Sequence, residues 1–233
     1  MKKMIVASTS TVYGSGPLEY LLPTLKEHFK DIKQLLFIPY ARPSGISYDE
    51  YTTKVSKPFA TLGIQVKGIH EFKNPRTAVN QAEGIFTGGG NTFELVNQLY
   101  RNGLIYVLKN AVENGTPYLG TSAGSNICGV TMMNTNDMPI VYPPSYDTLS
   151  LIPFNINAHY LDPIEGSTHM GETRETRIKE FHIYNETPVL GLREGSWLEV
   201  FGDEIVLRGP HTARLFKQGE TPVELATQTK ISI

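Results

Sequence analysis

Short apolar runs alternate with longer amphipathic stretches along the first half of this 233-residue chain. Each run is apolar or alternating and is bounded by turn residues, which is the pattern of a β-strand. Regular alternation of strands and helices favours a parallel sheet that is covered by helices on both faces. We therefore predict an α/β fold, with strands at Met4–Ser8, Gln34–Ile38, Ile64–Ile69, Gly84–Thr87 and Tyr118–Gly120.

The stretches between these runs have the apolar spacing of amphipathic helices. The clearest one spans Thr92–Tyr100, which Asn91 or Thr92 itself can cap, and Leu104–Val112 repeats the pattern. Pro23 interrupts the first helical stretch, so this helix is predicted to be kinked or to start late.

The rhythm of the chain changes from about Met138 onward. The stretch to Asp162 is rich in Pro, Asn and Tyr and has few helix signals. After a helix predicted at Thr173–Tyr184, the chain continues as short strands and turns, one of them at Val189–Leu192. We interpret this part as a β-rich C-terminal extension of a single domain that spans residues 1–233.

Composition and charge exclude several classes of partner. The net charge is −2 and no run of Lys or Arg is present, so the footprint of a nucleic-acid binder is missing. The apolar stretch after the first lysines is too short for a signal peptide. The apolar and charged fractions of the chain do not suggest a membrane span. Cys128 is the only cysteine, which excludes an intrachain disulfide and a multi-cysteine zinc site. We expect a cytoplasmic monomer or homodimer that binds small molecules, not nucleic acid or membranes.

A serine lies between two glycines immediately after the last predicted strand of this series. The segment "GTSAG" at 120–124 has the pattern G-x-S-x-G, which places a serine on a sharp turn between a strand and a helix. Open α/β sheets bind their ligands at the carboxyl ends of such strands. We therefore interpret Ser122 as a nucleophile; the alternative is a small residue in a tight turn.

A serine nucleophile needs a base that removes its proton, and histidine is the usual one. The chain contains six histidines. His159 ends the segment "FNINAH", whose apolar residues alternate with asparagines as in a half-buried strand. A rigid element would then hold His159 at a strand tip; the alternative is a histidine bonded to the backbone. His169 lies in a loop that could approach a site, and the others are expected to be solvated: His28, His70, His182 and His211.

The base also needs an acid that fixes its tautomer and stabilises its protonated form. Asp137 gives the chain order Ser, Asp, His, whereas Glu194 gives the order Ser, His, Glu. Spacing does not choose between them, because such triads are defined by geometry and occur in several chain orders. Each acid is alternatively a turn residue bonded to its own backbone.

Acyl transfer further requires N–H donors for the developing oxyanion. The segment "FTGGGNTF" places Gly88, Gly89 and Gly90 between a strand and a helix, so their N–H groups could point into a shared cleft. The N–H of Ala123, directly after the serine, is the natural second donor. The glycine loop lacks both G-x-G-x-x-G and the G-K-[ST] ending, so nucleotide binding is not expected.

Five segments together resemble one family. In this order and spacing, they are similar to peptidase E, the α-aspartyl dipeptidase family of serine peptidases: "GGGNTFELVNQL", "GTSAGSNICG", "TNDMPIV", "NINAHY" and "GETRETRIKEF". The resemblance implies hydrolysis of dipeptides with an N-terminal aspartate in the cytoplasm, without a metal or other cofactor. It also implies a fold similar to class I glutamine amidotransferases. The alternatives are an isoaspartyl or cyanophycin-type peptidase on the same fold, or a non-catalytic ligand-binding relative.

Carried over residue by residue, the resemblance implies that Ser122 is the nucleophile and His159 the base. Asp137 matches the aspartate usually assigned to the relay, and Glu194 matches a glutamate that could replace it; we favour Asp137. Gly89 and Ala123 would then hold the oxyanion.

Selectivity for aspartate calls for a fixed cation, because a guanidinium binds a carboxylate with two parallel hydrogen bonds. In "GETRETRIKEF", Arg174 shares a helical face with Ile178 and Phe181, which should be anchored in the core. Arg174 is therefore expected to point inward, and the resemblance to peptidase E implies that it binds the substrate. The alternative is a surface salt bridge with Glu172 or Asp162.

Overall fold

The computed structural model describes residues 1–163, 166, 168 and 170–233. Seven strands form a mixed sheet in the order β3-β2-β4-β5-β1-β8-β9. The first five strands of this order are parallel and confirm the five strands predicted from the sequence. The last two form an antiparallel hairpin that continues the sheet beyond β1. The bounds are β1 (Lys3–Ala7), β2 (Gln34–Ile38), β3 (Gln65–Gly68), β4 (Ile85–Thr87), β5 (Tyr118–Thr121), β8 (Trp197–Phe201) and β9 (Glu204–Arg208).

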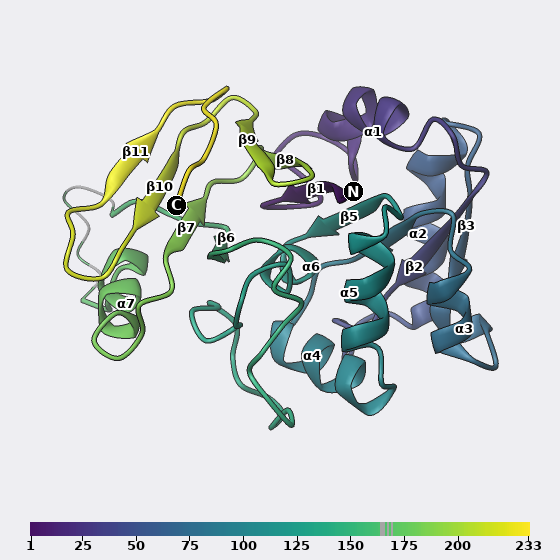
Figure 1. Cartoon of the computed structure of the whole chain (residues 1–233), viewed down its shortest axis with the longest axis horizontal. Coiled ribbons are helices and arrows are strands. Elements are labelled where there is room, and N and C mark those ends of the chain that lie inside the picture. Colours follow the sequence, from purple (N-terminus) through teal and green to yellow (C-terminus); the bar gives the residue numbers. More distant parts are fainter. Residues whose placement is uncertain (164–165, 167, 169) are drawn as a thin grey trace.

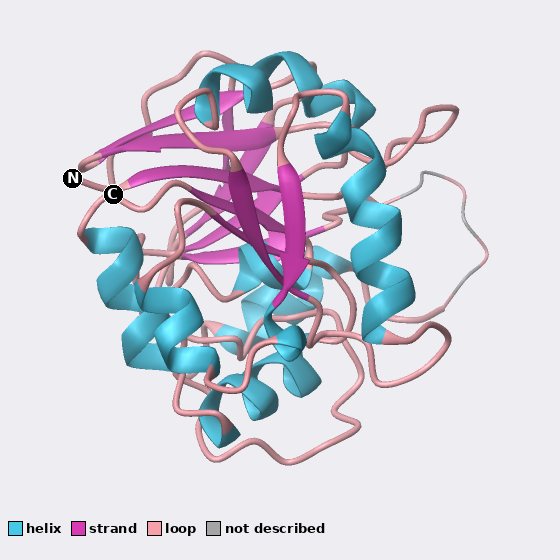
Figure 2. Ribbon diagram, turned by 90° about the vertical axis from the view of Figure 1, so that its right-hand side faces the viewer, coloured by secondary structure: helices cyan, strands magenta, loops and turns pink. Residues whose placement is uncertain are grey.

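Both faces of this sheet are buried, because successive side chains along each strand enter different clusters of the core. In β1, Met4 and Val6 pack on one face, and Ile5 and Ala7 on the other. The second of these faces is covered by α1 (Leu22–His28), the short 3-10 helix η1 (Glu19–Leu21) that precedes it, and α2 (Tyr48–Ala60). Figure 2 shows helices on both sides of the strands. The first face is covered by α3 (Pro75–Asn80), α4 (Thr92–Arg101), α5 (Ile105–Glu113) and α6 (Ala123–Asn126), with η2 (Ile69–Glu71) at its edge.

The helix boundaries follow local chemistry. The side chain of Asn91 accepts a hydrogen bond from the N–H of Glu94 and caps α4, as predicted. Helix α1 starts late, as predicted, with Pro23 in its first turn, where a missing N–H costs no helical hydrogen bond. Helix α2 begins with a capping box in which Ser47 and Glu50 bond each other's backbone N–H groups.

A second sheet lies beside the main one and has the order β11-β10-β7-β6 (Figure 1). Its strands are β6 (Asn155–Ala158), β7 (Val189–Leu192), β10 (Ala213–Phe216) and β11 (Val223–Leu225), and α7 (Arg174–Phe181) joins β6 to β7. The predicted β-rich tail therefore divides between two sheets. The strand at β6 was expected to be half-buried, which is wrong, because Asn155 and Asn157 are as buried as their apolar neighbours. Their amides bond backbone groups of residues 130, 131 and 134.

Ser8, directly after β1, joins the two sheets at their carboxyl ends. Its hydroxyl donates to the carbonyl oxygen of Leu192 at 2.7 Å and accepts the N–H of His159 at 2.9 Å. Its own N–H donates to the carbonyl oxygen of Ser196 at 3.1 Å. The ends of β1, β6 and β7 are thereby held together at one edge of the molecule.

Two histidines differ from the prediction that they are solvated. His28 is buried and its Nε2 bonds the carbonyl oxygen of Tyr118 at 3.1 Å; burial lowers its pKa to about 3. His182 is also buried, with Nε2 3.1 Å from the carbonyl oxygen of Thr187. In both cases a ring nitrogen bonds a backbone carbonyl oxygen, which a sequence pattern does not reveal. His211 is exposed, His70 is half-buried, and His169 lies outside the described residues.

Candidate active site

Ser122 occupies a strained turn between β5 and α6. Its φ of 54° and ψ of −114° are unusual for a residue with a side chain. The flanking glycines make this turn possible: a Cβ on Gly120 would lie 2.3 Å from the carbonyl oxygen of Gly124, and one on Gly124 would lie 2.1 Å from that of Thr87. The turn projects the Ser122 hydroxyl beyond the end of the sheet, as the G-x-S-x-G pattern predicts.

His159 and Glu194 emerge side by side from the second sheet. Strands β6 and β7 are parallel neighbours, with Ala158 paired to Leu192, so the residues that follow each strand lie at the same edge. His159 Nε2 lies 2.9 Å from Ser122 Oγ, and His159 Nδ1 lies 2.6 Å from Glu194 Oε1. A proton on Nδ1 that is donated to the carboxylate leaves Nε2 free to accept the serine proton. This is the arrangement that a general base requires.

Asp137, the acid favoured from the sequence, does not bond His159 in this structure. Its Oδ2 accepts the N–H of Thr92 at 2.7 Å and the hydroxyl of Thr135 at 3.2 Å. Asp137 therefore lies at the N-terminus of α4, where unpaired N–H groups and the helix dipole favour a carboxylate. The carboxylate that contacts His159 is that of Glu194.

The glycine loop after β4 packs directly against the serine. A Cβ on Gly89 would lie 2.9 Å from the Cβ of Ser122, so a larger residue would push the loop away. The N–H of Ser122 donates to the carbonyl oxygen of Ala7 at 3.1 Å. By contrast, no hydrogen bond between described residues uses the N–H of Gly89 or of Ala123. Both predicted oxyanion donors thus have N–H groups available beside the serine.

Arg174 begins α7 and is half-buried, with Ile178 and Phe181 buried on the same face, as predicted. Burial lowers the pKa of its guanidinium, and the positive charge of Arg177 lowers it further. The carboxylate of Asp137 raises this pKa in part. A partly desolvated cation therefore interacts electrostatically with Asp137, whose carboxylate lies at the N-terminus of α4.

The predicted alternative for Arg174, a salt bridge with Glu172 or Asp162, is absent from the described part of the chain. Glu172 lies 3.8 Å from Arg177, and Asp162 lies 2.7 Å from Arg193. None of the ion pairs formed between described residues includes Arg174.

Two residues beside Glu194 were not predicted. Burial raises the pKa of the Tyr20 hydroxyl, and the negative charge of Glu194 raises it further. This hydroxyl donates to the carbonyl oxygen of Thr9 at 2.6 Å. The Tyr20 hydroxyl therefore stays neutral, and no sequence pattern points to this residue. Ser8 holds the backbone of His159, and its position at the end of a predicted strand was a signal for it.

The described residues include no group of three or more His, Cys, Asp or Glu side chains that could hold a metal ion. Among the helices of the described residues, none is both long and apolar enough to cross a membrane.

Comparison with known proteins decides the family. The family model "Peptidase family S51" matches residues 4–208. The chain belongs to peptidase family S51. It is a serine peptidase, and the names of its relatives support a serine dipeptidase.

Two relatives match this S51 member over nearly their whole length. "Peptidase E" of Streptomyces coelicolor is 49% identical over 229 residues, which cover 98% of this chain and 93% of that protein. "Probable alpha-aspartyl dipeptidase" of Drosophila melanogaster is 42% identical over 228 residues, which cover 97% and 94%. The crystal structure of a peptidase from an acI-B1 Actinobacterium has a TM-score of 0.75 at 16% identity and covers 100% of this chain and 97% of its own. This likeness shows the α/β fold, which is consistent with a class I glutamine amidotransferase-like fold.

Proposed function

We propose that this S51 peptidase hydrolyses dipeptides whose N-terminal residue is aspartate, through an acyl-enzyme on Ser122. The observation that carries the proposal is the chain of hydrogen bonds from Ser122 through His159 to Glu194 at the carboxyl ends of three strands. The names of the relatives, peptidase E and α-aspartyl dipeptidase, support the choice of substrate.

In the first half of the reaction, His159 Nε2 accepts the Ser122 proton while Oγ attacks the carbonyl carbon after the aspartyl residue. Glu194 stabilises the protonated ring through Nδ1. The N–H groups of Gly89 and Ala123 donate to the oxyanion as it forms. His159 then transfers the proton to the leaving amine, and the peptide C–N bond breaks.

In the second half, His159 accepts a proton from a water molecule that attacks the aspartyl ester. Collapse of this second intermediate breaks the ester bond, returns the proton to Ser122 and releases aspartate. The same N–H groups donate to the oxyanion in both halves, so they lower the activation barrier of both acylation and deacylation.

Arg174 is proposed to bind the side-chain carboxylate of the substrate's aspartate. The support is its partial burial, the absence of an ion-pair partner among the described residues, and its electrostatic interaction with Asp137 at the start of α4. A carboxylate that enters this place gains a charge-assisted contact with a guanidinium that is already partly desolvated.

The test compares the unmodified enzyme with Ser122→Ala on Asp-Leu. The variant should lose at least about a thousandfold in kcat, because the nucleophile is gone. Its melting temperature should change by no more than about 2–4 °C, because the replacement removes one oxygen from an already accessible turn. A fluorophosphonate should label only the unmodified enzyme. If Ser122→Ala hydrolyses Asp-Leu at the rate of the unmodified enzyme, Ser122 is not the nucleophile. If the unmodified enzyme cleaves β-aspartyl-Leu in preference to Asp-Leu, the isoaspartyl alternative is favoured.

A further inference from the structure

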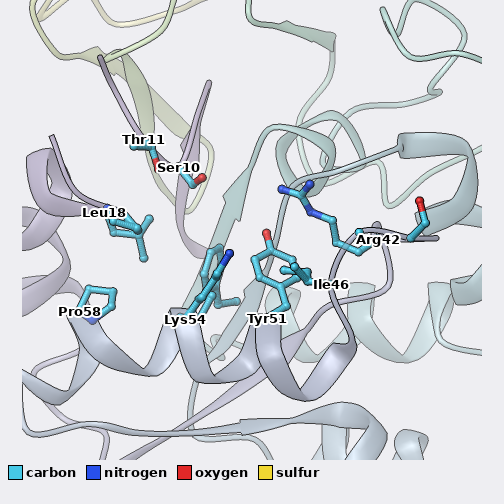
Figure 3. Close-up of a pocket in the computed structure, with 13 residues that line it drawn as sticks. Ser10, Thr11, Leu18, Arg42, Ile46, Tyr51, Lys54 and Pro58 are labelled. Carbon is cyan, nitrogen blue, oxygen red and sulfur yellow. The ribbon is translucent and has the colours of Figure 1, made fainter. Parts of the chain in front are cut away.

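A cavity of about 330 Å³ lies next to the candidate active site and has a role in none of the steps above (Figure 3). Its walls are apolar side chains of the core that packs beneath α1 and α2, among them Leu18, Val55 and Phe86. Its mouth is polar, with Arg42, Lys54 and the hydroxyls of Ser10 and Thr11. The cavity therefore combines an apolar interior with a cationic opening.

The lining of the cavity is connected to the residues around Ser122 by one hydrogen bond and by one short backbone segment. Tyr51, one of its lining residues, donates its hydroxyl to the carbonyl oxygen of Gly89 at 3.2 Å, and Gly89 packs against Ser122. Ser10 lies two residues after Ser8, which holds the backbone of His159. The cavity is thus lined by one residue that bonds the glycine loop and by another that closely follows the strand exit holding His159.

The two cations of this cavity are free to meet an anion. Arg42 lies over the ring of Tyr51, 5.2 Å from its centroid, and no carboxylate of the described residues forms an ion pair with Arg42 or Lys54. In Figure 3, Arg42, Lys54 and the hydroxyl of Tyr51 reach toward one space, across from Ser10 and Thr11. Two positive charges and the hydroxyls of Ser10 and Thr11 around one space suit a carboxylate.

We infer that this cavity binds the C-terminal residue of the dipeptide, with Arg42 and Lys54 holding its free carboxylate and the apolar walls holding its side chain. The inference rests on the proposed function. An aspartyl side chain is one methylene and a carboxylate and would leave most of 330 Å³ empty, whereas a leaving amino acid brings both an apolar group and a carboxylate.

The position of the base supports the same direction of binding. His159 must protonate the leaving nitrogen, so the leaving residue must lie on the side of the strand exit that holds His159. Arg174 interacts electrostatically with Asp137 at the start of α4, and α4 covers the opposite face of the sheet from the cavity. A dipeptide would therefore extend across Ser122, with one carboxylate toward each cationic group. A longer peptide would carry its terminal carboxylate past Arg42 and Lys54, so the cavity selects for dipeptides.

The experiment measures kcat/KM for Asp-Leu and for its C-terminal amide, Asp-Leu-NH2, in the unmodified enzyme and in Arg42→Gln and Lys54→Gln. The unmodified enzyme should prefer the free acid by about tenfold or more, and each variant should reduce this ratio severalfold, mainly through KM. Lys57→Gln is the matched control, since Lys57 is exposed on the same helix and does not line the cavity. It should leave the ratio unchanged.

Binding to Ser122→Ala, measured by calorimetry, gives a second readout that needs no turnover. Asp-Leu should bind this variant more tightly than Asp-Leu-NH2, and adding Arg42→Gln should remove the difference. Equal affinity or equal kcat/KM for acid and amide overturns the inference. The inference is also overturned if Arg42→Gln loses the preference of the unmodified enzyme for Asp-Leu over Asn-Leu. That result would show that the cavity binds the aspartyl side chain. Absence of Asp-Leu cleavage by the unmodified enzyme would instead refute the proposed function, and the binding comparison would still decide the role of the cavity.

Discussion

Replacing Glu194 with glutamine isolates what its carboxylate does for His159. Glutamine keeps the size of the side chain but removes the charge that stabilises a protonated ring. Its amide can also donate to Nδ1, which favours the tautomer with the proton on Nε2. In that tautomer Nε2 cannot accept the proton of Ser122, so the attack step should slow.

The magnitude follows from the geometry of the pair. A buried acid in such a triad contributes about 10⁴ to kcat. Here the His159–Glu194 contact is short, at 2.6 Å, but the side chains are 39% and 49% exposed, so water screens part of the interaction. We therefore expect a smaller loss, about 10²–10³ in kcat, which corresponds to about 3–4 kcal/mol of transition-state stabilisation. KM for Asp-Leu should change little, because Glu194 has no assigned contact with the substrate.

The assay is steady-state hydrolysis of Asp-Leu, with Asp137→Asn as the matched variant. It makes the same isosteric change on the acid that bonds Thr92 and Thr135, so kcat should fall by less than about tenfold. Its melting temperature should fall slightly, because a carboxylate at the start of α4 is lost. A large loss in Asp137→Asn together with near-normal kcat in Glu194→Gln would refute the assignment of Glu194.

Three further predictions test recognition, packing and acid stability. Arg174→Ala should cost about 2–5 kcal/mol in kcat/KM for Asp-Leu while fluorophosphonate labelling of Ser122 persists; full Asp-Leu activity would contradict the role of Arg174. Gly124→Ala should destabilise the fold by about 1–3 kcal/mol and reduce activity, because the new Cβ would lie 2.1 Å from the carbonyl oxygen of Thr87; unchanged melting and kinetics would contradict this. His28 has a pKa of about 3 when folded, against about 6.5 when unfolded, so its contribution to stability is lost as the pH falls from about 6.5 toward 3. Urea unfolding at pH 4.5 and 7 should show a loss of about 2–3 kcal/mol from this group, and His28→Gln should have a correspondingly weaker pH dependence.

Much of the fold could be predicted because its signals are local. The five parallel strands and α4 follow from apolar periodicity and from the cap at Asn91. The division of the C-terminal strands between two sheets could not be predicted, because it depends on which distant strand each one pairs with. The neutral, buried state of His28 depends on one long-range backbone acceptor, Tyr118, and so was equally hidden.

The candidate site shows the same distinction between local and long-range information. Ser122 could be predicted because two glycines and a preceding strand define its turn within five residues. Arg42 and Lys54 could not, because an arginine in a loop and an exposed lysine on a helix have the pattern of an ordinary solvated surface. Only the folded chain brings them to the same opening as Ser10 and Thr11.

The identity of the acid beside His159 was decided by the pairing of two strands. Both His159 and Glu194 follow segments that the sequence predicts as strands, whereas Asp137 follows none. Parallel neighbours end at the same edge of a sheet, so adjacency of β6 and β7 is sufficient to bring a residue after Ala158 close to one after Leu192. The adjacency itself is a contact between segments more than thirty residues apart, with α7 in the crossover, and no local pattern encodes it. A carboxylate that follows a strand is therefore a stronger candidate than one in an irregular loop, because only the former has a sheet to fix its position relative to the histidine.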